Sequence, residues 1–64
     1  MKQSKKMQIQ KRILSIKPGK PIVVKTDDER IQFINIGRDM KNYGQIEYDV
    51  VSRETNGGFK VGIL

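Results

Sequence analysis

Apolar residues recur at helical spacing in the centre of the chain and predict one long helix between Thr26 and Gly44. Thr26 suits the start of this helix, because its hydroxyl can accept a hydrogen bond from an otherwise unpaired backbone N–H. Gly44 suits its end, since glycine adopts the left-handed conformation without steric cost. The side expected to face the core carries Phe33, Ile36, Gly37, Met40 and Tyr43.

The N-terminal segment carries a second, shorter helical pattern. Ile9, Ile13 and Ile16 follow the spacing i, i+4, i+7, which favours a helix from Ser4 to Ile16. The alternation of Met7 and Ile9 with glutamines also permits a strand, and this alternative stays open.

Three further segments complete the first half of the chain. Residues 1–6 are polar and basic, and we expect them to form a flexible tail. Residues 17–20, Lys-Pro-Gly-Lys, predict a turn. Residues 21–25 are rich in β-branched side chains and predict a short strand, and Pro21 at its start suits the edge of a sheet.

The C-terminal part alternates at period two and predicts a β-hairpin. The expected strands are Ile46–Arg53 and Phe59–Leu64. Between them, Asn56-Gly57 is the strongest short hairpin signal, and it predicts a type I′ turn with positive φ at both residues.

A two-residue loop also determines which residues face each other across the hairpin. Thr55 is expected opposite Gly58, and Arg53 opposite Lys60. One sheet face then collects the apolar residues Ile22, Val24, Ile46, Tyr48, Val50, Phe59, Val61 and Ile63. The predicted fold class is α+β in the order α-β-α-β-β, with one central helix packed on a small three-stranded sheet that ends in a C-terminal β-hairpin.

The opposite sheet face leaves Val23, Val51 and Leu64 without cover from the central helix. Either the first helix covers them or a second subunit does, and we expect the helix. This point separates two functions, because uncovered apolar residues favour a protein interface or a homodimer. If the helix covers them, the exposed surface is mostly charge and nucleic acid is favoured.

Composition restricts the class of protein. Sixty-four residues make one domain, 1–64, with a small core. The chain has no Cys and no His, which excludes disulfides and Cys/His zinc sites and fits a reducing cytoplasm. It has no apolar run long enough to span a membrane and no secretory signal pattern. We therefore expect a cytoplasmic protein without a membrane segment.

Charge is distributed unevenly along the chain. Residues 1–25 carry eight Lys/Arg and no acid, whereas residues 26–64 carry five basic and seven acidic residues, so the net charge of +6 comes from the N-terminal part. Clustered basic charge is typical of a partner that is a polyanion, most often nucleic acid. The competing interpretation is a lysine-rich end that keeps a small protein soluble.

Catalytic groups are scarce. Without His or Cys, the commonest general bases and nucleophiles are missing. Asp27, Asp28 and Glu29 are clustered, but carboxylates in the first turn of a helix already interact favourably with its dipole. No calcium-loop or phosphate-loop spacing accompanies them. We therefore expect a non-enzyme with no cofactor and no bound metal.

Three groups of basic residues are candidates for phosphate contacts. The N-terminal group is Lys5, Lys6, Lys11, Arg12, Lys17 and Lys20; the flank of the central helix carries Arg30, Arg38 and Lys41; the hairpin carries Arg53 and Lys60. Each group has a second interpretation. The lysines can be merely solvated, and the helix flank can pair with its own acids. In the hairpin, facing cations are unfavourable unless an anion binds, but Glu54 next to Arg53 can relieve part of this repulsion.

The element order is similar to that of winged-helix DNA-binding domains, whose terminal hairpin is the wing. The resemblance implies DNA contacts from a helix and from the hairpin tip. The chain departs from that layout, which needs two helices between the short strand and the hairpin. The 18 residues from Thr26 to Tyr43 favour one helix.

The leading functional hypothesis is a small basic DNA-binding protein with a regulatory role, of bacterial or phage origin. Double-stranded DNA is expected rather than RNA or single strands, because the four aromatic residues are all assigned to the core and leave no stacking surface. The alternative is a small protein-interaction module or inhibitor that binds an acidic surface of a larger partner.

Overall fold

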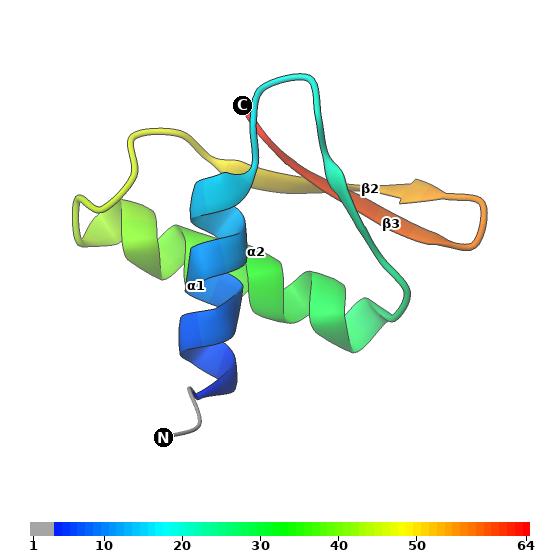
Figure 1. Ribbon diagram of the computed structural model, residues 1–64, viewed down its shortest axis with the longest axis horizontal. Helices are drawn as coiled ribbons and strands as arrows, with labels where there is room; N and C mark the ends of the chain where they lie inside the picture. Colours follow the sequence, from blue (N-terminus) through cyan, green and yellow to red (C-terminus); the bar gives the residue numbers. More distant parts are fainter. Residues whose placement is uncertain (1–3) are drawn as a thin grey trace.

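Residues 4–64, which the computed structural model describes, form two helices and a three-stranded antiparallel sheet (Figure 1). The elements are α1 (Lys5–Ser15), β1 (Ile22–Val24), α2 (Asp27–Asn42), β2 (Val50–Thr55) and β3 (Gly58–Ile63). The predicted α+β class and α-β-α-β-β order are confirmed. The strand order is β1-β3-β2, so β1 and β2 are the two edges of the sheet.

The limits of α2 follow from its two caps. The Thr26 hydroxyl accepts a hydrogen bond from the Glu29 N–H at 3.2 Å. At the other end Gly44 has a φ of +77°, and the Gln45 N–H donates to the Met40 carbonyl at 2.8 Å. Together these features form a Schellman cap, as the sequence predicts for a helix followed by glycine.

The core side of α2 matches the predicted pattern at every position except the last. Phe33, Gly37 and Met40 are buried and Ile36 is half-buried, but Tyr43 is 82% exposed. The prediction for Tyr43 is wrong because the helix ends at Asn42. Tyr43 is the C-cap residue and has non-helical backbone angles, so helical spacing no longer directs its side chain to the core.

The N-terminal pattern forms a helix and not a strand. Ser4 caps α1, since its hydroxyl accepts a hydrogen bond from the Met7 N–H at 3.2 Å. Lys5 and Lys6, which the sequence assigned to a flexible tail, belong to the first turn of this capped helix. The rest of the predicted tail, residues 1–3, lies outside the described residues.

The predicted register of the hairpin is confirmed. Thr55 lies opposite Gly58, and Arg53 lies opposite Lys60. The first strand is shorter than predicted and begins at Val50 instead of Ile46. Pairing stops at Asp49, whose carbonyl accepts from the Leu64 N–H at 2.9 Å, so residues 46–48 have no strand beside them.

The turn of the hairpin differs from the predicted type I′. Gly57 has a φ of +84°, but no residue other than glycine has positive φ in the described part of the chain, so Asn56 keeps an ordinary φ. Only one of the two central residues is therefore in the left-handed region. The requirement for glycine falls on Gly57.

Gly57→Val is expected to destabilise the hairpin by about 1–2 kcal/mol, because a β-branched residue resists positive φ. Thermal unfolding followed by circular dichroism measures the effect. Asn56→Ala is the matched control, since alanine tolerates the ordinary φ of that position. Equal melting temperatures for Gly57→Val and the parent protein would contradict the left-handed turn.

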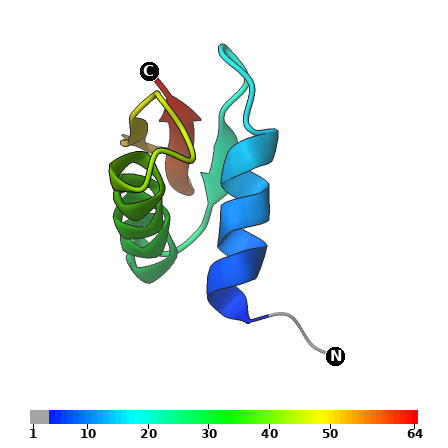
Figure 2. The same cartoon turned by 90° about the vertical axis from the view of Figure 1, so that its left-hand side faces the viewer.

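The first helix does not cover the second face of the sheet, and this prediction is wrong. Ile9, Ile13 and Ile16 are buried in the same core as Phe33 and Val61. Accordingly α1 packs across α2, and its N-terminal end points away from the sheet (Figures 1 and 2). One shared core buries the apolar sides of both helices, so neither remains for the opposite face of the sheet.

Neither α1 nor α2 has both the length and the apolar character needed to cross a membrane, and residues 4–64 contain no other helix.

Candidate interaction surface

The sheet face opposite the helices is formed by every second residue of each strand. Side chains alternate between the two faces of a strand, and paired residues share a face. The register therefore aligns Val23 of β1, Lys60 of β3 and Arg53 of β2 in one row across the sheet. We use the name outer face for the part of this side away from the hairpin turn, together with the residues next to the strand ends: Pro21, Val23, Val51, Arg53, Lys60, Gly62 and Leu64.

The outer face is open and partly apolar. Val23 is 55% exposed, Val51 37% and Leu64 82%. A concavity of about 450 Å³ lies on this face beside Val51 and Leu64. Its lining residues are Pro21, Val51, Ser52, Arg53, Lys60, Gly62 and Leu64. Gly62, near the end of β3, contributes no side chain, so the surface is lower at this point of the face.

The cations of the outer face have no anionic partner in the described part of the chain. Arg53 and Lys60 lie directly opposite each other, and neither forms an ion pair with any of residues 4–64. Glu54 follows Arg53 in sequence, but strand alternation places it on the other face, opposite Phe59. Two facing cations on a β-ladder are unfavourable unless an anion lies between them.

The cations on the flank of α2 are less available for phosphate contacts than the sequence indicates. The Arg30 guanidinium pairs with Asp27 at 2.5 Å and lies 5.2 Å from the centre of the Phe59 ring. Lys41 pairs with Asp49 at 2.6 Å. Of the three flank cations, Arg38 is exposed and makes no ion pair within residues 4–64. Pairing with the protein's own acids therefore accounts for two of the three.

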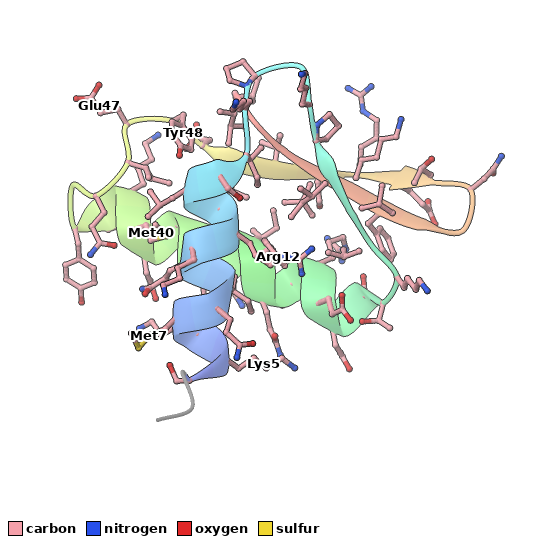
Figure 3. The ribbon with its side chains drawn as sticks, viewed as in Figure 1. Lys5, Met7, Arg12, Met40, Glu47 and Tyr48 are labelled. Carbon is pink, nitrogen blue, oxygen red and sulfur yellow. The ribbon has the colours of Figure 1, made fainter. Side chains whose placement is uncertain are left out.

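The N-terminal cations are exposed and spread along α1 and the turn after it. They are Lys5, Lys6, Lys11, Arg12, Lys17 and Lys20. Arg12 packs its guanidinium 5.2 Å from the centre of the Phe33 ring. Lys5 lies at the end of α1 that points away from the sheet (Figure 3). The N-terminal group thus extends from the far end of α1 to the turn between Lys17 and Lys20, which directly precedes Pro21.

Two residues of the outer face were missed by reasoning from charge. Pro21 and Gly62 line the concavity although neither carries a functional group. A Cβ built on Gly62 would lie 3.5 Å from the Pro21 Cβ, so these residues are direct neighbours. The sequence signal was available, because glycine inside a strand often marks a place where another chain or ligand approaches closely.

Two residues of the acidic cluster at the start of α2 make local contacts. Asp27 pairs with Arg30, and Glu29 donates its backbone N–H to the Thr26 cap. Within residues 4–64, no three acidic side chains lie close enough together to hold a metal ion.

The likeness to winged-helix domains stops at the element order. One helix, α2, connects β1 to the hairpin, as the length of that segment predicts. No protein-family model, curated protein or solved structure matches the chain. The functional assignment therefore depends on the geometry and charge of these surfaces.

Proposed function

We propose that the chain is a non-enzymatic protein-interaction module whose outer face binds an acidic segment of a larger partner protein. One observation carries this proposal: exposed Val23, Val51 and Leu64 share one sheet face with Arg53 and Lys60, which have no ion-pair partner in the described structure. The apolar side chains gain free energy when a partner removes them from water. The two cations select a partner that carries carboxylates.

A second copy of the chain is a poorer occupant of this face. Stacking two outer faces would enclose four cations, Arg53 and Lys60 of each copy, with no carboxylate side chain from this face, and like charges in an interface cost several kcal/mol. A partner of opposite charge removes this penalty. We therefore favour a different protein over a homodimer.

The composition agrees with a binding role. The chain has no His and no Cys, the side chains that most often serve as general base or reactive nucleophile. The absence of cysteine also supports a reducing compartment such as the cytoplasm.

Double-stranded DNA is the second candidate partner, and a different observation favours it. The exposed cations of α1 and its following turn form no ion pairs with the acids of residues 4–64. Residues 1–25 contain no acid at all. Such a surface can neutralise backbone phosphates without reading sequence.

Charge reversal on the outer face distinguishes the two candidates. The probe is a synthetic peptide that repeats Glu-Thr-Val-Thr, and a Lys-Thr-Val-Thr peptide is the charge control. The double variant Arg53→Glu/Lys60→Glu is expected to weaken binding of the acidic peptide about tenfold, because two surface ion pairs are replaced by repulsion. Fluorescence anisotropy at low salt measures both affinities.

Lys11→Glu on α1 is the matched control variant, and it is expected to leave peptide binding unchanged. A labelled DNA duplex is titrated in parallel at several salt concentrations. Absence of peptide binding, together with duplex binding that weakens steeply with salt and is reduced by Lys11→Glu, would reject the protein partner and establish DNA.

A further inference from the structure

The strand β2 is an open edge of the sheet. It pairs with β3 alone, and its six residues contain no proline. The other edge strand, β1, has only three residues and follows Pro21. A long edge without proline presents unpaired backbone groups that can accept a further strand.

The hydrogen-bond pattern shows which backbone groups of β2 face this edge. The Leu64 N–H donates to the Asp49 carbonyl at 2.9 Å, so Asp49 occupies a hydrogen-bonded position of the antiparallel ladder. These positions alternate along an antiparallel strand. The backbone groups of Val51, Arg53 and Thr55 therefore point to β3. Those of the residues between them, Val50, Ser52 and Glu54, point to the open side.

The same alternation determines the side chains next to an added strand. Val51 and Arg53 belong to the outer face, and toward the open edge they occupy positions that are not hydrogen-bonded. In an antiparallel pair such positions bring facing side chains closest, with Cα atoms about 4.5 Å apart. A carboxylate opposite Arg53 and an apolar residue opposite Val51 would be two residues apart in the added strand.

The inner side of this edge also has room. A concavity of about 390 Å³ lies beside β2 and is lined by Asp27, Arg30, Ser52, Glu54 and Phe59. The residue between the carboxylate and the apolar side chain would point to this side, opposite Ser52. A small polar side chain such as threonine fits there next to the Arg30–Asp27 ion pair.

We propose that the acidic partner binds as a fourth, antiparallel strand along β2, with a carboxylate facing Arg53 and an apolar residue facing Val51. This inference rests on the proposed function and adds how the partner is held. Backbone hydrogen bonds to Val50, Ser52 and Glu54 supply affinity, and the two outer-face side chains supply specificity.

Two other interpretations of the edge compete with this one. In the first, the only role of Arg53 and Glu54 is to prevent the edge from pairing with another sheet edge, as charges on edge strands often do. Alternatively, β2 of a second copy can occupy the edge. Each of these interpretations predicts a result that differs from the one expected for an added acidic strand.

Amide hydrogen exchange of the full chain, followed by NMR with and without the Glu-Thr-Val-Thr peptide, tests the proposal. At a peptide concentration about ten times the Kd, the amides of Ser52 and Glu54 are expected to exchange about tenfold more slowly. The amides of Val51 and Arg53 already bond to β3 and serve as internal references.

Two methylated peptides supply the matched control. N-methylation of the threonines removes the N–H groups that face β2 and is expected to abolish both binding and protection. N-methylation of the glutamates and valines alters only the far edge of the peptide and is expected to preserve both.

The outcomes separate this inference from the proposed function. If the peptide binds and Arg53→Glu/Lys60→Glu weakens it, but Ser52 and Glu54 are not protected, strand addition is wrong and the interaction module stands. If the peptide does not bind, both proposals fail. If both amides are protected without peptide and the protein sediments as a dimer, a second copy occupies the edge and strand addition by an acidic partner is overturned.

Discussion

Phe33→Ala is expected to unfold a large share of the protein under native conditions. Phe33 is 1% exposed and lies in the core that α1, α2 and the sheet share. Truncation of a buried phenylalanine costs about 3–5 kcal/mol. A single core in a chain of fewer than about 70 residues rarely supplies more than about 3–5 kcal/mol of stability, so the loss consumes most of it.

Urea unfolding followed by circular dichroism measures this change as a shift of the transition midpoint. Ile31→Ala is the matched control on the same helix, because Ile31 is 41% exposed and its truncation leaves no buried cavity. If the midpoint of Phe33→Ala equals that of Ile31→Ala, Phe33 does not hold the two helices and the sheet together.

Gly37→Ala is expected to destabilise the protein although alanine is the better helix former. A Cβ at this position would lie 2.5 Å from Val50 Cγ2 and 2.6 Å from Val50 Cβ. Overpacking of a core costs about 1–3 kcal/mol, whereas alanine gains about 1 kcal/mol over glycine in a helix. The clash outweighs the gain because one of the contacted atoms is the Val50 Cβ, which moves only with its backbone.

A double-mutant cycle isolates this contact. Val50→Gly removes the three Val50 atoms nearest to the new Cβ, so Gly37→Ala is expected to cost less free energy of unfolding in that background. Contacting residues show coupling energies of about 0.5–3 kcal/mol. Additive free energies in urea unfolding would show that α2 and β2 do not approach closely at Gly37.

Phe33→Ala and Gly37→Ala both test the packing of the helices on one side of the sheet, and this packing leaves the outer face open. Phe33 and Gly37 let α2 pack closely against one side of the sheet. Ile9 and Ile13 of α1 are buried in the same core. The other side then carries Arg53 and Lys60 among exposed valines. The interaction surface is therefore a consequence of how the core is divided.

The local elements could be predicted from the sequence because their causes are local. The hydroxyl of Thr26, the left-handed Gly44 and the two-residue loop at Gly57 each act within a few residues. Together with the period of the apolar residues they determined the element order and the hairpin register. The same register placed Arg53 opposite Lys60 and Val51 on the second face of the sheet.

The tertiary structure alone decided which surfaces remain open. The apolar edge of α1 shows that the helix must be buried, but no local signal states on which face of the sheet. Likewise, Lys41 is not available for a phosphate because it pairs with Asp49, a residue that only the folded loop brings near. The sequence by itself thus determined the elements, the caps and the pairing of the hairpin. Only tertiary packing decided that one core takes both helices and leaves the outer face uncovered, because long-range burial depends on the total apolar area that each arrangement removes from water.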